Sequence, residues 1–198
     1  MKKIFIALIV ILLVASNLLA CSSIDVGHIE TVYDILNELT KIEYNTVEVT
    51  ITTDTNGLQL QSTYITTSNT IEYSVEVFNA LEGGAEMLPE EYKSTFSGVA
   101  KIKDGKVTEI DGDTVSLPSY DSLKGSFNFK KENFKSVEDK NGKFTAIVID
   151  PSNLLGISAN GVSNMMITVR YNDSAIESIL LTYNTEKSSV TTEYIFGL

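Results

Sequence analysis

The chain has few of the residues on which most catalytic and metal sites depend. One histidine, His28, and one cysteine, Cys21, occur in 198 residues. A Ser-His-Asp or Cys-His site needs a histidine as its base, and zinc sites need several His or Cys ligands. A single cysteine also excludes an intramolecular disulfide. We therefore expect no enzyme activity, no metal site and no cofactor.

Acidic residues are plentiful, so carboxylate chemistry stays open on residue types alone. The segment Asp111-Gly112-Asp113 lacks the ligand spacing of an EF-hand, and we interpret it as a turn with solvated acids. Gly83-Gly84 is not followed by the Gly-Lys-Ser/Thr of a phosphate loop. Arg170, the one arginine in the sequence, lies in a predicted strand. It either binds an anionic head group or pairs with an acid across the sheet.

Positive charge is also scarce. The formal net charge is −11 at pH 7, which argues against a nucleic-acid partner because phosphate binding needs clustered Lys and Arg. So acidic a surface also disfavours a domain that lies flat on anionic lipid heads. The simpler explanation of the charge is that it maintains solubility.

One long apolar run occurs, and it lies at the N-terminus. Met1-Lys2-Lys3 precedes the apolar residues 4–15, which is the order of a signal peptide. A helix needs about 20 apolar residues to span a bilayer, so this run is marginal as a permanent anchor. The tetrapeptide Leu18-Leu19-Ala20-Cys21 then resembles the bacterial lipobox. The alternatives are an uncleaved N-terminal helix and a plain secretory signal with an incidental cysteine.

The lipobox resemblance implies a diacylglyceryl group on the Cys21 thiol, fatty acyl chains such as palmitate, and cleavage after Ala20. Two acyl chains anchor a protein stably where one does not. Residues 1–20 contain two lysines and no acid, so their removal leaves 178 residues with a net charge of −13. We expect residues 21–27 to form a lipidated tether and residues 28–198 a single domain. That domain would lie outside the cytoplasm, on the outer leaflet of the cell membrane or on an outer membrane.

The spacing of apolar residues predicts mostly strands after one helix. Residues 28–43 carry apolar side chains at three- and four-residue spacing, which predicts an amphipathic helix. Alternation with a period of two follows, and about ten strands in a largely sequential antiparallel meander are expected. The predicted strands include 115–117 and 127–129, and Asp150 to Gly156 predicts a short helix. The fold class is therefore α+β and β-dominated, with a curled antiparallel sheet packed on the N-terminal helix.

This order of elements is similar to the LolA-like lipoprotein-carrier superfamily and its LppX/LprG-type relatives. The resemblance implies a half-open barrel around helices and an apolar cavity for acyl chains. The alternating pattern is equally that of a solid core made of the same residues. The candidates to line a cavity are Leu36, Leu39, Tyr73, Val75, Phe127, Phe129, Leu154, Leu155, Met165 and Met166.

Two functions follow from these observations. The first is a membrane-anchored lipoprotein that binds or carries a lipid-like ligand. The second is a non-catalytic protein-interaction or sensor module that uses the sheet face or the loop at residues 82–95, with an unknown protein partner. The second predicts an exposed apolar patch in place of a cavity.

Overall fold

The computed structural model describes residues 26–79, 86–87, 95–156 and 158–198. Cys21 and the predicted signal peptide lie outside the described residues, as does most of the predicted interaction loop at 82–95. Among the described residues, none of the helices has the length and hydropathy of a membrane-spanning helix.

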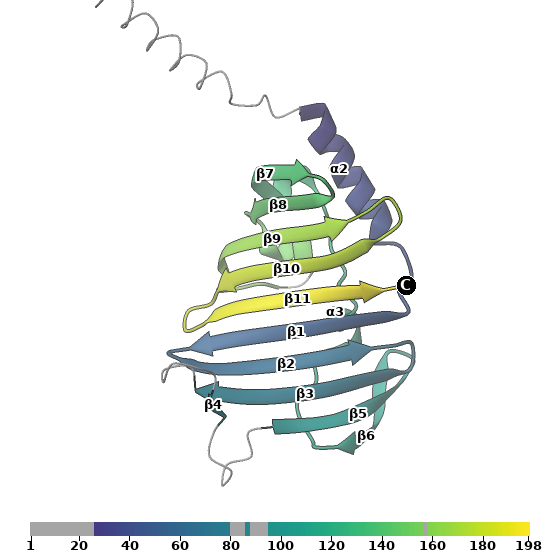
Figure 1. Ribbon diagram of the computed structural model, residues 1–198, viewed down its shortest axis with the longest axis vertical. Helices are drawn as coiled ribbons and strands as arrows, with labels where there is room; N and C mark the ends of the chain where they lie inside the picture. Colours follow the sequence, from purple (N-terminus) through teal and green to yellow (C-terminus); the bar gives the residue numbers. More distant parts are fainter. Residues whose placement is uncertain (1–25, 80–85, 88–94, 157) are drawn as a thin grey trace, which may run out of the picture.

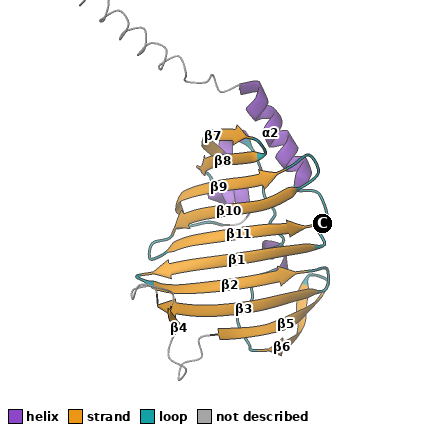
Figure 2. Ribbon diagram, viewed as in Figure 1, coloured by secondary structure: helices purple, strands orange, loops and turns teal. Residues whose placement is uncertain are grey.

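The protein is β-dominated, as the sequence predicts, with an antiparallel sheet and few helices (Figures 1 and 2). The helices are α2 (Val26–Leu39), α3 (Tyr120–Leu123) and α4 (Pro151–Leu155), with a 3-10 turn η1 (Lys131–Asn133). The strands are β1 (Thr46–Thr55), β2 (Leu58–Thr66), β3 (Thr70–Asn79), β4 (Glu86–Met87), β5 (Thr95–Lys103), β6 (Lys106–Gly112), β7 (Phe134–Lys140), β8 (Lys143–Val148), β9 (Ser163–Tyr171), β10 (Ile176–Asn184) and β11 (Ser189–Gly197).

The sheet is built from two meanders that meet in its middle. Its strand order is β6-β5-β3-β2-β1-β11-β10-β9-β8-β7, and β4 pairs with β3 beside this path. The chain starts at β1, moves out to the edge strand β6, and crosses through residues 113–133 to the opposite edge strand β7. It then returns strand by strand until β11 pairs with β1. The path runs from β6 to β7 without closing, so within the described residues the sheet is open.

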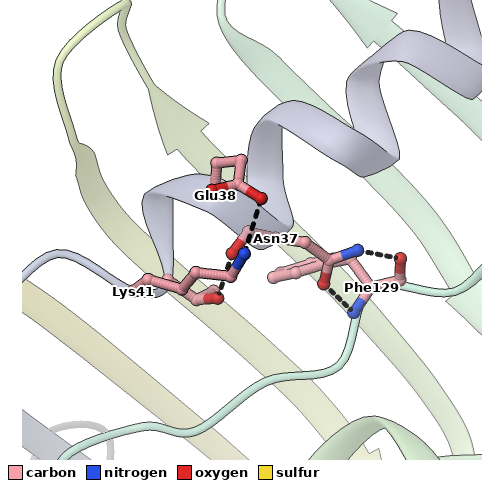
Figure 3. Close-up of polar contacts among 5 residues, drawn as sticks. Asn37, Glu38, Lys41 and Phe129 are labelled. Atoms are coloured by element: carbon pink, nitrogen blue, oxygen red, sulfur yellow. Dashed lines mark hydrogen bonds and ion pairs between the residues drawn. The ribbon is translucent and has the colours of Figure 1, made fainter.

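The prediction of one largely sequential meander is therefore wrong at the crossing segment, which we define as residues 113–133. Residues 115–117 and 127–129 are not strands, and β7 is a strand that the pattern did not predict. Phe127 and Phe129 are both buried, but the backbone N–H groups of residues 128 and 129 form hydrogen bonds with partners that are not strands of the sheet. The Asn128 N–H donates to the Leu154 carbonyl, and the Phe129 N–H donates to the Asn37 side chain (Figure 3). Alternating burial here comes from a segment that lies across the sheet.

Local features that involve only neighbouring residues follow from the sequence, and the short helix predicted after Asp150 is confirmed. At the Asn141-Gly142 turn between β7 and β8, both residues have positive φ, 54° and 71°, as a two-residue hairpin turn requires. In α4, the Asp150 carboxylate accepts from the Asn153 N–H at 3.0 Å and Pro151 stands in the first turn. Gly156 ends this helix in the left-handed conformation.

The side chains on the inner face of the sheet form two apolar cores. The first core joins α2 to β7–β11 and contains Val32, Leu36, Phe129, Phe144 and Ile167 among its most buried members. The second core joins β1, β2, β3 and β5 to α3. Both bury side chains that alternate with more exposed, mostly polar ones along the strands that contribute to them, so the sheet has one covered face and one wet face.

Candidate functional site

A cavity of about 570 Å³ lies where the two cores approach one another. Its walls come from residues 40–45 after α2, Val47 of β1, residues 66–68 at and just after the end of β2, and residues 120–127 of the crossing segment. The beginning of β10 and the end of β11 complete it. Tyr44 and Phe196, which pack against both cores, line this junction.

The floor and the rim of the cavity differ in chemistry. The apolar and aromatic side chains that line it are Ile42, Tyr44, Val47, Tyr120, Phe127, Ile176, Ile179 and Phe196. Of these, Ile176 and Ile179 are 1% and 0% exposed, so they belong to the floor. The exposed residues that line it are all polar: Glu43, Asn45, Ser68, Lys124 and Ser126. The cavity is therefore amphipathic, with an apolar base and a polar mouth.

Lys124 and Tyr120 form the side of the rim that belongs to the crossing segment. The Lys124 amino group lies 4.6 Å from the centroid of the Tyr120 ring, within the range of a cation–π interaction. The Tyr120 hydroxyl donates to the Thr67 carbonyl at 2.6 Å, which joins α3 to the turn after β2. No ion pair to Lys124 is found among the described residues. Its charge is available to a negatively charged group at the mouth.

Tyr44 holds the segment after α2 against the sheet. Its hydroxyl accepts from the Ile176 N–H at 2.9 Å and donates to the Leu39 carbonyl at 3.2 Å. Its ring lies 4.7 Å from the ring of Phe196, centroid to centroid. Burial raises the pKa of Tyr44, and the hydrogen bond from Ile176 opposes that rise. The hydroxyl therefore stays protonated and keeps the hydrogen that it donates to the Leu39 carbonyl.

Of the ten candidates that the sequence suggested for a cavity lining, Phe127 lines this one. Leu36, Leu39, Phe129, Leu154 and Met165 are buried in the first core, and Leu155 packs against that core. Tyr73 is buried in the second core, and Val75 is half-buried on the same face of β3. Met166 is 47% exposed on the outer face.

The sequence pattern missed most of the cavity because its residues come from the ends of elements. Thr66, Thr67 and Ser68 lead into a turn, and Gly125 lies in an irregular segment with φ of 68°. No periodicity marks such positions. The available signal was the small-residue pair Gly125-Ser126 beside the apolar Phe127, which indicates a close approach of the backbone without saying to what.

The sequence also raised the acidic segment at residues 111–113, a metal site and His28 as possible sites of chemistry. The segment Asp111-Gly112-Asp113 is not the turn that the sequence predicted, because Asp111 and Gly112 end strand β6 and pair with Val99 and Gly98 of β5. The Asp113 carboxylate accepts from the Ser97 N–H at 3.0 Å, and the Asp113 carbonyl accepts from the Tyr73 hydroxyl. In the described part of the chain, no group of three or more His, Cys, Asp and Glu is placed to hold a metal ion. The side chain of His28 lies outside the described residues.

Comparison with known proteins adds no family to this description. No protein-family model matches the chain, and no curated protein matches it either.

Proposed function

We propose that this protein is a membrane-anchored extracytoplasmic lipoprotein that binds a single-chain, lipid-like ligand in the cavity between its cores. The observation that carries the proposal is the division of the cavity into an apolar floor and a polar mouth. An amphiphile with an apolar chain and a polar end matches that division. A volume of about 570 Å³ is within the range of ligand pockets, roughly 300–1,000 Å³.

The volume also limits the size of the ligand. At the ~30 Å³ that a water molecule occupies in the liquid, about 570 Å³ holds roughly nineteen groups of that size. One acyl chain with a small head fits this space, whereas a phospholipid with two long chains exceeds it. A carboxylate or phosphate at the head would face Lys124, and the chain would lie along Val47, Ile179 and Phe127.

Support for the membrane anchor comes from the sequence. Acylation would use the lone cysteine, Cys21, and four residues separate it from the first residue of α2. The open antiparallel sheet with a helix on its inner face agrees with the half-open barrel that the LolA-like resemblance implies. The anchor itself is tested by the mass of the N-terminal peptide from membranes, with Cys21→Ser as the unlipidated control.

Ligand binding is tested on the mature chain, residues 21–198 with Cys21→Ser, purified without detergent. Organic extraction and mass spectrometry should identify a bound single-chain amphiphile. Calorimetric titration of the extracted, ligand-free chain with lauric acid should then show one site.

A cavity-filling variant tests where that ligand binds. Val47→Phe places a larger ring in the cavity, and we expect it to weaken lauric-acid binding at least tenfold. The matched control is Val99→Phe at a position 38% exposed on the outer face, which should leave binding unchanged. Equal affinities for both variants and the parent chain, or no binding at all, would contradict the proposal.

One observation favours the interaction module as a second candidate. Leu58 and Leu60 of β2 share a face with the buried Tyr64 but are 49% and 40% exposed. Leu60 lies opposite Val77 of β3, so these side chains form an apolar strip beyond the second core. Crosslinking in intact cells separates the two functions: a stable protein partner lost on Leu60→Ser would favour the module.

A further inference from the structure

Three basic side chains converge on the outer face of the sheet near its β7 edge. In the paired register, Lys143 of β8 lies opposite Arg170 of β9 and opposite Lys140 of β7. All three are exposed. We call Lys140, Lys143 and Arg170 the basic cluster.

This arrangement is unfavourable unless an anion compensates it. Like charges on directly opposite residues of neighbouring strands destabilise a sheet. Some lysines elsewhere in the described chain pair with acids, as in Lys101–Glu109 at 2.8 Å and Lys131–Glu30 at 2.8 Å. No ion pair to any member of the basic cluster is found among the described residues. Three positive charges thus lie together on a chain whose net charge is strongly negative.

The cluster surrounds a shallow cleft with further polar groups. The cleft has a volume of about 410 Å³ and is also lined by Glu138, Asn141 and Thr145. The guanidinium of Arg170 presents a planar fork of donors that suits phosphate oxygens, and the two ammonium groups add point charges. Among the described residues, Glu138 is the one acid that lines the cleft, so the lining keeps a net positive charge.

The cluster lies at the edge of the sheet where the N-terminal helix packs. Glu30 near the start of α2 pairs with Lys131, and the Tyr33 ring stacks on the Phe134 ring at the start of β7 at a centroid distance of 5.8 Å. Figure 1 shows the N-terminal end of α2 beside β7. Cys21 is five residues before Val26, a span of at most about 18 Å. This edge of the sheet is therefore the one nearest the proposed anchor.

We infer that the basic cluster binds the phosphate groups of anionic lipid head groups and turns the β7 edge toward the membrane surface. The inference rests on the membrane attachment proposed above. Lys and Arg side chains within a Debye length of an anionic leaflet are attracted to its surface. Three such groups orient an anchored domain even when its net charge is negative.

The test is co-sedimentation of the unlipidated mature chain (residues 21–198, Cys21→Ser) with vesicles at low ionic strength. We expect binding to phosphatidylglycerol–phosphatidylcholine vesicles and none to pure phosphatidylcholine. The variant Lys140→Gln, Lys143→Gln, Arg170→Gln should reduce binding about tenfold or more. The matched control is Lys101→Gln, Lys103→Gln, Lys106→Gln at the opposite edge, which changes the net charge equally and should retain binding.

A gain-of-binding variant keeps the test independent of folding defects. Glu138→Gln removes the acid of the cleft and should strengthen binding, whereas Glu193→Gln on the same face should do so much less. Equal losses in the two triple variants, or binding to inorganic phosphate without binding to vesicles, would overturn the inference. Lauric-acid affinity is measured separately, so a failure here is distinguishable from a failure of the cavity proposal.

Discussion

The side-chain amide of Asn37 binds the backbone of Phe129 through two hydrogen bonds (Figure 3). Its Nδ2 donates to the Phe129 carbonyl at 2.8 Å, and its Oδ1 accepts from the Phe129 N–H at 3.0 Å. The two residues are 92 positions apart. This pair joins α2 to the crossing segment, whose next residues lead into β7.

Replacing Asn37 should therefore destabilise the protein more than its exposure suggests. Asn37→Ala removes both bonds and leaves two backbone groups of Phe129 without their partners. We expect the free energy of unfolding to fall by about 2–3 kcal/mol, measured by urea denaturation. Lys41→Ala is the control, because the neighbouring Lys41–Glu38 pair is 66% and 72% exposed and should contribute less than about 0.5 kcal/mol. Similar losses for both variants would contradict this role of Asn37.

A buried asparagine network at the other side of the crossing segment supports a second prediction. Asn133 is 0% exposed. It donates to the Asn128 carbonyl at 2.8 Å and accepts from the Asn153 amide at 2.8 Å. Asn133→Ala should cost about 2–3 kcal/mol, because it leaves buried polar groups unsatisfied.

The coupling within this network is measurable by a double-mutant cycle in urea. Asn133→Ala and Asn153→Ala together should cost less than the sum of the single effects, since each removes the same bond. The exposed Asn45 provides the control, and Asn45→Ala should change stability by less than about 0.5 kcal/mol. Strict additivity of the two buried positions would argue against the network.

Gly98 gives a prediction about the packing of the second core. It lies opposite Tyr73 in the β3–β5 register. A Cβ at Gly98 would lie 2.7 Å from Tyr73 Cζ and 2.5 Å from the Asp111 carbonyl oxygen, closer than packed atoms approach. Gly98→Ala should lower the melting temperature and cost about 1–3 kcal/mol through this overpacking. Ser97→Ala on the outer face of the same strand should have little effect.

Two half-buried tyrosines predict a loss of stability in alkali. The pKa of Tyr194 is raised from 10.0 to about 12, mainly by burial and to a smaller extent by the charge of the nearby Tyr183. Burial, and then the hydrogen bond and negative charge of Asp139, raises the pKa of Tyr171 to about 12. A raised pKa in the folded state means that the protonated tyrosine stabilises the fold fully below pH 10. That stabilisation is lost as the pH rises from about 10 to 12, because the unfolded chain releases its protons first.

Urea denaturation at several pH values, with tyrosinate absorbance as the titration readout, checks this prediction. Tyr194→Phe keeps the ring that packs edge-on to Phe127 but removes the ionisable group. This variant should show a smaller loss of stability between pH 10 and 12 than the parent chain. An unchanged pH dependence would contradict the assignment to Tyr194.

The sequence by itself determined the local features of this protein. Asn56-Gly57, Asp104-Gly105 and Asn141-Gly142 each adopt positive φ at both residues, because the conformations that Asn, Asp and Gly tolerate are properties of the residues. The period-two alternation likewise predicted strands with one buried face. The short helix after Asp150 followed from its cap, its proline and its terminal glycine. All of these depend on neighbours in the chain.

The tertiary structure alone decided the strand order, the course of the crossing segment and the position of the cavity. Alternating apolar residues at 127–129 predict burial, but they do not say whether the partner is a neighbouring strand or the amide of Asn37. The register of Lys140, Lys143 and Arg170 likewise depends on how β7, β8 and β9 pair. Such contacts join residues far apart in sequence, and their energies depend on shape and distance in the folded chain. The pattern of residue types along the sequence contains neither that shape nor those distances.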